Sequence, residues 1–316
     1  MHDVLTGSDA TVKLEFEHPA EVGLVSVIIP VGADPEGLEI TLRSLQEHLP
    51  AGSFEVVVAN DGADPAVAAV CARYPHVVEL PLVPNRGPAA ARNAAAAVTR
   101  GEILAFLDAD LTVWPGWWES MQEALQSSDL ACGNVEIDPR QITTFAHFYD
   151  SLVAFDVPRY VKHNHAVSGN LAIRRTALER VGGFDSRFRS GEDNEFGKRA
   201  HANGVDIRYA AQMGVYHPPR DTRAQYRKIY RVVVGRLQLA EQLPQRFGGY
   251  RLTPRLFVSL LVPPRHFLRS AVSWTDVPTS RRARVYAARY ARNLYTLGAY
   301  VWVAARGADG RRHDLS

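Results

Sequence analysis

Two aspartates, Asp108 and Asp110, directly follow an apolar run and are separated by one alanine. Two carboxylates one residue apart on a turn can bind one hard divalent cation, Mn²⁺ or Mg²⁺, and leave positions open for phosphate oxygens. The alternatives are a solvated strand end and a helix cap, because such pairs are common in proteins. By themselves the two residues give only the hypothesis of a metal site.

A third aspartate and an arginine could take part in the same chemistry. Asp61 ends another apolar run, where a carboxylate can accept a hydrogen bond from a nucleobase N–H. The Asn-Asp-Gly sequence around it makes an Asx-turn the alternative. Arg92 lies one turn into an alanine-rich segment that begins after Gly87. There it can bind phosphate or a carboxylate, whereas the alternative is a solvent-exposed side chain.

Two further acids and a histidine follow later in the chain. Glu192 and Asp193 come after Gly191 and open a predicted helix, where the helix dipole favours carboxylates as caps. The functional interpretation is a general base that takes a proton from a hydroxyl nucleophile. His217 follows Asp193 by 24 residues and ends a predicted strand. A lone histidine is usually structural, but a neutral imidazole can also be a third metal ligand.

The elements that must position these residues alternate between strands and helices. Apolar runs predict four buried strands, and helical spacing of apolar or small residues predicts a helix after each of them. The strands are expected at 25–30, 54–61, 77–83 and 102–108, and the helices near 38–49, 65–74, 87–98 and 116–126. This alternation predicts parallel βαβ units and a doubly wound α/β sheet. In such sheets ligands bind beyond the carboxyl ends of the strands.

The order is less regular after about residue 129. Strands are predicted at 130–137, 167–175 and 213–217, with a helical, aromatic segment between the first two. A helix is predicted from Gly191 to Gly204, and from Thr222 onward the chain looks mainly helical. We therefore expect an N-terminal extension at 1–23, a catalytic domain at 24–220 and a basic, helical C-terminal region at 221–316.

Composition limits the class of protein. The 316 residues are 46% hydrophobic and 22% charged, as in ordinary globular proteins, and they include two cysteines. Two cysteines provide no disulfide framework, which favours a reducing, cytoplasmic location. No apolar run is long enough to predict a membrane-spanning helix. The polar segment 1–23 lacks the pattern of a signal peptide.

Taken in order, the motifs resemble those of the inverting family 2 glycosyltransferases, which have the Rossmann-like GT-A fold. The resemblance covers roughly Val25 to His217. It rests on VSVIIP, EVVVANDG, NRGPAAARNAAA, GEILAFLDAD, SGNLAIRR, GGFDSRFRSGED and the late histidine. The family's alternation of motifs implies a GT-A domain, here followed by a mainly α-helical region.

The resemblance implies a role for each matching residue. Asp61 matches the acid that binds the nucleobase, and Arg92 matches an arginine near the donor. Asp108 matches an acid that approaches both the ribose and the cation. Asp110 and, in some members, the residue matching His217 bind the metal. The nucleotide-sugar site is accordingly expected to include Pro30, Asp61, Arg92, Asp108 and Glu192, with Asp193 as the catalytic base.

One departure from the family pattern concerns the loop after the first strand. Family members often have an aromatic residue and an asparagine after the proline, whereas Val31, Gly32 and Ala33 follow Pro30 here. The usual stacking contact with the base is therefore not expected from this loop.

The function expected from the resemblance is metal-dependent, inverting transfer of a sugar from a nucleoside-diphosphate sugar to a hydroxyl. UDP is the first choice of nucleotide, with GDP and dTDP as alternatives, and the acceptor is a glycan or a lipid-linked compound. A nucleotidyltransferase is one alternative, but segment 31–37 lacks the basic residues of its phosphate loop. A non-catalytic sugar-nucleotide-binding or scaffold subunit is the other.

The C-terminal region carries most of the positive charge. Residues 1–217 contain 17 basic and 29 acidic residues, whereas residues 218–316 contain 19 and 5. The segment 280–307 has a 12-residue apolar core, 294–305, which is too short to span a bilayer but suits an interfacial helix. The segment 256–269 is similar. We expect contact with an anionic membrane, at the inner face of the plasma membrane, or plain packing or oligomerisation; nucleic acid is the least favoured partner.

Overall fold

The computed structural model describes residues 14–262 and 277–313, with side chains described up to Arg306 in the last segment. In this part of the chain one eight-stranded mixed sheet forms the centre of the molecule, in the order β3-β2-β1-β4-β7-β6-β8-β5. The strands are β1 (Glu21–Val31), β2 (Phe54–Asp61), β3 (Val77–Leu82), β4 (Gly101–Leu107), β5 (Thr112–Val113), β6 (Leu130–Ile137), β7 (Asn170–Arg174) and β8 (Ile207–His217). The predicted α/β class is confirmed.

The first four strands form the predicted parallel half of the sheet. β1 lies between β2 and β4, and β3 is at the edge, all of them parallel. The connecting helices are α1 (Pro35–His48), α2 (Pro65–Cys71) and α3 (Pro88–Ala97), followed after β4 and β5 by α4 (Trp117–Gln126). Each of the first three has proline in its first turn, where the missing N–H is not needed.

The second half of the sheet differs from a wholly parallel arrangement. β7 runs antiparallel to both β4 and β6, while β6 and β8 are parallel. β6 ends, and β7 begins, at the same edge of the sheet, and the helices α5 (Phe145–Val153) and α6 (Val157–Lys162) connect them there. Because no crossover returns the chain to the opposite edge, β7 must run in the reverse direction. The parallel pattern predicted for the first four strands therefore does not extend to this half.

Two element boundaries also differ from the predictions. β8 begins at Ile207, six residues before the predicted start, and it continues to His217. The helix α8 (Glu192–Ala202) ends two residues earlier than predicted, and Gly204 follows in a left-handed conformation with φ of 73°. The helix α7 (Arg175–Val181) precedes it.

The core lies on both faces of the sheet. The apolar strands are buried, with Val27, Ile28 and Ile29 of β1 wholly inaccessible to solvent. The predicted apolar face of α1 packs against them through Leu38, Leu42 and Leu45. Such strands can place polar groups only at their ends, which is where the candidate residues lie.

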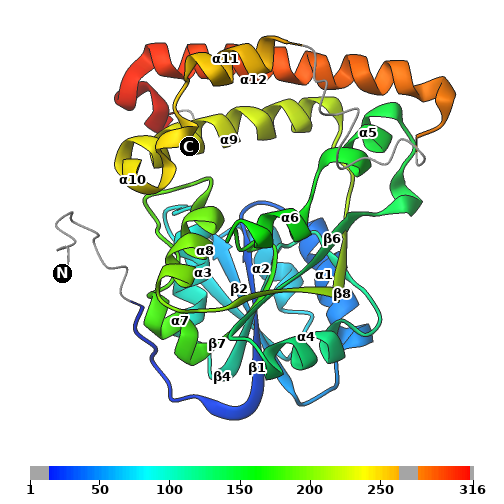
Figure 1. The fold of residues 1–316 in the computed structure, drawn as a ribbon. Helices are drawn as coiled ribbons and strands as arrows, with labels where there is room; N and C mark the ends of the chain where they lie inside the picture. Colours follow the sequence, from blue (N-terminus) through cyan, green and yellow to red (C-terminus); the bar gives the residue numbers. More distant parts are fainter. Residues whose placement is uncertain (1–13, 263–276, 314–316) are drawn as a thin grey trace, which may run out of the picture.

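The helical C-terminal region packs on the sheet domain. It consists of α9 (Thr222–Gln242), α10 (Pro244–Phe247), α11 (Pro254–Leu261) and α12 (Thr279–His313). Figure 1 shows α9, α11 and α12 lying across one end of the sheet. At Gly235, α9 contacts the loop before α8 so closely that a β-carbon would overlap Ser190. Among the described helices, none is both long and apolar enough to cross a membrane.

Candidate active site

The candidate residues meet at one edge of the sheet. β2 and β4 run parallel and end at Asp61 and Leu107, so Asp61 and Asp108 lie at the same edge. β6 and β8 have the same direction, because β7 is antiparallel to both β4 and β6, and His217 therefore ends at this edge too. The sheet topology thus brings together residues up to 156 positions apart in the chain.

Asp61 holds the loop that precedes α3. Its carboxylate accepts hydrogen bonds from the backbone N–H groups of Arg86 and Gly87, at 2.7 and 2.8 Å. The side chain of Asn85 donates to the backbone oxygen of Asp61 at 2.8 Å. The local turn bond is made instead by Asn60, whose side-chain oxygen accepts from the N–H of Asp64 at 2.8 Å. Asp61 is therefore not the Asx-turn residue, and it orients the loop beside the site.

Pro30 lies close to the carboxyl end of β1. It is paired in register with Ala59 of β2, near Asp61, and it is half-buried. The side chain is thus at the expected edge, next to the loop that departs from the family pattern.

Arg92 is a buried side chain of α3 and not a surface arginine. Its side chain is 4% exposed, and its guanidinium group lies between two carboxylates. One Nη donates to Asp108 at 2.8 Å and the other to Glu192 at 3.2 Å. Its Cζ also lies 5.6 Å from the centroid of the Phe184 ring. Arg92 therefore joins the end of β4 to the start of α8, 100 residues away.

The backbone around Asp108 leaves room for its carboxylate. The N–H of Asp108 donates to the backbone oxygen of Gly169 at 3.2 Å, at the start of β7. A β-carbon on Gly169 would lie 2.6 Å from an Asp108 carboxylate oxygen. Because a carboxylate cannot tolerate that approach, glycine is required here if Asp108 keeps its position. The side chain of Asp108 is 44% exposed and accessible to a ligand.

Asp110 and His217 face each other next to Asp108. The distance from His217 Nε2 to an Asp110 carboxylate oxygen is 3.6 Å. Burial and the charge of Asp108 raise the pKa of Asp110 to about 6. Burial and the Arg220 guanidinium lower the pKa of His217 to about 3, so its imidazole is neutral. Nδ1 of His217 lies 2.5 Å from the backbone oxygen of Pro218, which assigns the proton to Nδ1 and leaves the Nε2 lone pair directed to the site.

These groups fit a divalent cation in chemical type. Two carboxylates and a neutral imidazole are ligands that Mn²⁺ accepts, and the crowded carboxylates would be stabilised by a positive charge. A side chain of this protein partly supplies that charge, because an Arg220 Nη contacts His217 Nε2. Among residues 14–262 and 277–306 no three His, Cys, Asp or Glu side chains converge as a ready ligand set. Arg220 must therefore move if Nε2 is to bind a cation.

The candidate base lies on the other side of Glu192. Nε2 of His165 is 2.9 Å from an Asp193 carboxylate oxygen, and the N–H of Asn194 donates to the other oxygen at 2.7 Å. Burial alone would raise the pKa of Asp193, but His165 and the N–H of Asn194 hold it below its ordinary value. Burial and the Asp193 charge raise the pKa of Glu192. The two neighbouring acids thus differ in pKa, and Asp193 is the one that stays ionised.

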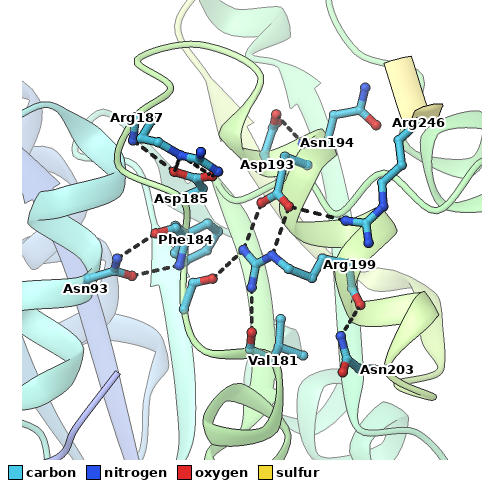
Figure 2. A network of polar contacts seen from close by, with 12 residues as sticks. Asn93, Val181, Phe184, Asp185, Arg187, Asp193, Asn194, Arg199, Asn203 and Arg246 are labelled. Atoms are coloured by element: carbon cyan, nitrogen blue, oxygen red, sulfur yellow. Dashed lines mark hydrogen bonds and ion pairs between the residues drawn. The ribbon is translucent and has the colours of Figure 1, made fainter. Parts of the chain in front are cut away.

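A polar network fixes the loop that leads to Asp193, as Figure 2 shows. Arg199 of α8 bonds to Glu195 and to the backbone oxygens of Val181 and Gly183. Asn93 of α3 makes two hydrogen bonds to the backbone of Phe184, at 2.7 and 2.8 Å. The start of the loop is thereby tied to both α3 and α8, which holds α8 and its acids near α3.

Sequence reasoning missed three residues of the site. His165 pairs with Asp193, Arg220 contacts His217, and Gly169 makes room for Asp108. His165 and Gly169 lie in or just before the predicted strand at 167–175, but nothing in their spacing indicates which side chain they meet. Arg220 follows His217 by three residues, which is the one local signal of the three.

Two family models match parts of this chain. The model of glycosyl transferase family 2 matches residues 26–182, which include the ends of β1, β2 and β4. A second model, described as the N-terminal domain of galactosyltransferase, matches residues 147–222 and thus covers Asp193 and His217.

Two curated relatives are similar over much of the chain. Glycosyltransferase AglE of Haloferax volcanii is 30% identical over 254 residues, which are 77% of this chain and 83% of that protein. A pre-mycofactocin glycosyltransferase of Mycobacterium tuberculosis is 29% identical over 215 residues, 62% of this chain. The match spans only 43% of that second relative.

Two solved structures share the fold. A mannosyltransferase of Pyrobaculum calidifontis, in complex with GDP-Man and Mn²⁺, has a TM-score of 0.61 and 19% identity over 90% of this chain and 88% of its own. TarS of S. aureus (residues 1–349), in complex with UDP-GlcNAc, has a TM-score of 0.51 and 18% identity over 89% and 90%. The 30% identity to the Haloferax volcanii relative and the family match favour a glycosyltransferase over the two alternatives, a nucleotidyltransferase and a non-catalytic scaffold. The chain belongs to glycosyl transferase family 2, has a GT-A fold and is a glycosyltransferase.

Proposed function

We propose that this glycosyltransferase moves a sugar from a nucleoside-diphosphate sugar to a hydroxyl acceptor with inversion at the anomeric carbon. The observation that carries the proposal is the link between Asp108, Arg92 and Glu192, which joins the candidate metal site to the helix that carries Asp193. Inversion in a single displacement requires the residues that bind the donor and the catalytic base to be held in a fixed relative position, and this link would hold them so.

The residues have separable tasks in this reaction. Asp61 and Pro30 would contact the nucleobase, and Arg92, which bonds to Asp108 at 2.8 Å, would keep Asp108 directed toward the donor. Asp193 takes the proton of the acceptor hydroxyl as its oxygen forms a bond to the anomeric carbon. The bond from that carbon to the diphosphate oxygen breaks on the opposite face, so the configuration inverts and the nucleoside diphosphate leaves.

A divalent cation, Mn²⁺ or Mg²⁺, is part of the proposal. Asp108, Asp110 and His217 would hold it, and it would neutralise charge on the leaving diphosphate. The Mn²⁺ in the mannosyltransferase of the same fold supports this assignment. The donors in the two solved structures, GDP-Man and UDP-GlcNAc, support a nucleoside diphosphate, with UDP as our first choice and GDP or dTDP as alternatives.

Nucleotide titration tests this part of the proposal. UDP, GDP and dTDP are titrated calorimetrically with Mn²⁺ and again with EDTA, for the wild type and for Asp110→Ala. We expect one nucleotide to bind with Mn²⁺, and EDTA or Asp110→Ala to weaken that binding at least about tenfold. Binding that is equally strong in EDTA would contradict the metal assignment, and no binding of any nucleotide would contradict the donor class.

We also propose that the C-terminal helices attach the enzyme to an anionic membrane surface, as at the inner face of the plasma membrane. Apolar side chains are exposed on both helices of the outer layer, namely Phe257, Val258 and Leu261 of α11 and Leu294, Tyr295, Val301 and Trp302 of α12. Arginines flank these apolar residues, with Arg255 at the start of α11 and with Arg292 and Arg306 on either side of the apolar stretch of α12. Arg306 Cζ lies 4.3 Å from the centroid of the Trp302 ring. An interfacial helix combines these two properties.

Vesicle sedimentation tests the attachment. We expect the protein to sediment with vesicles that contain phosphatidylserine, more weakly with neutral vesicles, and more weakly after Trp302→Ser. Equal sedimentation of Trp302→Ser and wild type would contradict a role of α12 in membrane attachment.

A further inference from the structure

A group of half-buried basic side chains lies next to His217. We call Arg220, Lys228 and Arg292 the cationic cluster; Arg220 precedes α9, Lys228 is on α9, and Arg292 is on α12. The Lys228 ammonium lies 4.6 Å from the centroid of the Phe155 ring, and Arg220 Cζ lies 5.4 Å from the same centroid. This ring in turn lies 5.3 Å from the His217 ring. The Phe155 ring therefore contacts two members of the cluster, Arg220 and Lys228, as well as His217 of the candidate metal site.

Positive charge exceeds negative charge in the cluster. Asp150 of α5 is the buried carboxylate that acts on all three cations, and it accepts a hydrogen bond from the N–H of Arg220 at 2.9 Å. One Nη of Arg220 has no hydrogen-bond partner among the described residues and lies 3.8 Å from an Asp150 carboxylate oxygen. Burial and the neighbouring arginines lower the pKa of Lys228 to about 7. Asp150 is thus the described carboxylate that acts on all three basic groups, whereas Asp108 and Asp110 of the candidate metal site act on Arg220 among them.

Packing alone does not account for this arrangement. Like charges that are partly withdrawn from water repel one another and lose some hydration, so an apolar side chain of similar volume would pack here at lower cost. Residues that lower stability in this way are typical of binding sites. An anion that bound between the cations would remove both costs, and phosphate oxygens are the acceptors that arginine and lysine groups bind most strongly.

The position of the cluster indicates which phosphate it binds. It lies on the side of His217 that faces the C-terminal helices, and Arg292 of α12 is followed by the exposed Leu294 and Tyr295. A phosphate held here would be next to the reaction site, with an adjoining apolar chain along α12. We propose that Arg220, Lys228 and Arg292 form a binding site for a phosphate group of the acceptor, distinct from the donor site. This inference rests on the proposed function, because it assumes that an acceptor is bound.

The test uses the full chain in EDTA, so that no cation can hold phosphate at Asp108 and Asp110. Geranyl phosphate, inorganic phosphate and the uncharged alcohol geraniol are titrated calorimetrically into wild type, Lys228→Met and Lys162→Met. Lys162 is exposed on α6, and its substitution is the matched control. We expect geranyl phosphate to bind wild type and Lys162→Met equally, and Lys228→Met at least about tenfold more weakly.

The other probes separate the sources of the phosphate. Weaker binding of inorganic phosphate and of geraniol would support a lipid phosphate. Inorganic phosphate that binds as well as geranyl phosphate would support the site with a water-soluble acceptor. Equal binding of geranyl phosphate and geraniol would overturn the proposal, as would unchanged affinity in Lys228→Met.

Thermal unfolding with and without geranyl phosphate is a second test, and it uses two variants in case one of them folds poorly. We expect geranyl phosphate to raise the Tm of wild type but not of Lys228→Met, and we expect that variant without ligand to be at least as stable as wild type. Arg292→Met is the second variant and should give the same loss of the ligand effect. A Tm increase that persists in both variants would contradict the site.

The donor site is checked on the same protein samples. Nucleotide binding with Mn²⁺ should be the same in Lys228→Met and wild type. A parallel loss of nucleotide binding would overturn the acceptor assignment, because the cluster would then serve the donor diphosphate. Absence of nucleotide binding in the wild type would instead contradict the proposed donor. The phosphate titrations in EDTA would still test the cationic cluster, because they use no nucleotide.

Discussion

At the scale of single residues, Arg92 is the most consequential side chain of the candidate site. It is buried between Asp108 and Glu192 and is the cation that pairs directly with both. Removal of one partner of a buried ion pair leaves the others desolvated and uncompensated. We expect Arg92→Met to lower the free energy of unfolding by about 3 kcal/mol, measured by urea denaturation.

The matched control for this change is Arg43→Met. Arg43 is 73% exposed and pairs with Glu39 one helical turn away. Exposed pairs of this kind contribute little, so we expect a loss within about 0.5 kcal/mol. Equal losses in Arg92→Met and Arg43→Met would show that the buried bridge is not formed in solution.

His165 sets the pH range in which Asp193 can act as a base. Because His165 helps to hold the pKa of Asp193 below its ordinary value, its removal should let that pKa rise. A base acts while it is deprotonated, so activity falls as the pH drops through its pKa. In His165→Gln the acidic limb of the kcat/KM profile should therefore move to higher pH.

His163→Gln is the control for the pH profile. His163 is an exposed residue two positions earlier, and the same substitution there should leave the acidic limb in place. An unchanged acidic limb in His165→Gln would mean that Asp193 does not control it.

At the scale of the elements, the start of β7 decides whether Asp108 can keep its place. A β-carbon on Gly169 would lie 2.6 Å from the Asp108 carboxylate, so this side chain must shift in Gly169→Ala. We expect the variant to fold but to bind the nucleotide and Mn²⁺ at least about tenfold more weakly, since displaced ligands bind metals poorly.

Gly249→Ala provides the comparison, because a β-carbon there would meet nothing within 4 Å. Its nucleotide affinity should equal that of the wild type. If Gly169→Ala also bound the nucleotide and Mn²⁺ with wild-type affinity, the observed position of the Asp108 carboxylate would not be needed for donor binding.

The sequence predicted the parallel half of the sheet and the strand ends that carry Asp61 and Asp108. Those elements follow from local patterns, because a buried parallel strand is continuously apolar and its polar end is visible in the sequence. The direction of β7 was not predictable in this way, since it depends on where segment 138–169 passes. The roles of three residues were not predicted for the same reason, because each acts on a side chain from another segment: His165 on Asp193, Gly169 on Asp108 and Arg220 on His217.

At the scale of the whole molecule, the helical C-terminal region is part of one packed structure. Tyr300 of α12 is 1% exposed and packs with Val233 and Val234 of α9. The loss of a large buried aromatic side chain typically costs about 3 kcal/mol or more. Tyr300→Ala should therefore lower the free energy of unfolding by about this amount, measured by urea denaturation.

Trp302, two residues later, is the control for Tyr300, because we expect it to contribute to membrane attachment and not to the free energy of unfolding. It is 54% exposed, so Trp302→Ala should change the free energy of unfolding by less than about 0.5 kcal/mol. A large loss in Trp302→Ala, or none in Tyr300→Ala, would contradict the orientation of α12 and with it the proposed membrane surface.

Asp193→Asn tests the central claim of a general base most directly. The measurements are binding of the nucleotide with Mn²⁺, and release of nucleoside diphosphate from the donor with acceptor or water; Asp206→Asn, an exposed aspartate, is the control. We predict unchanged nucleotide binding and a fall in kcat of about 10²-fold or more in Asp193→Asn alone. Turnover within a few-fold of the wild type, or a loss of nucleotide binding, would contradict the role of Asp193.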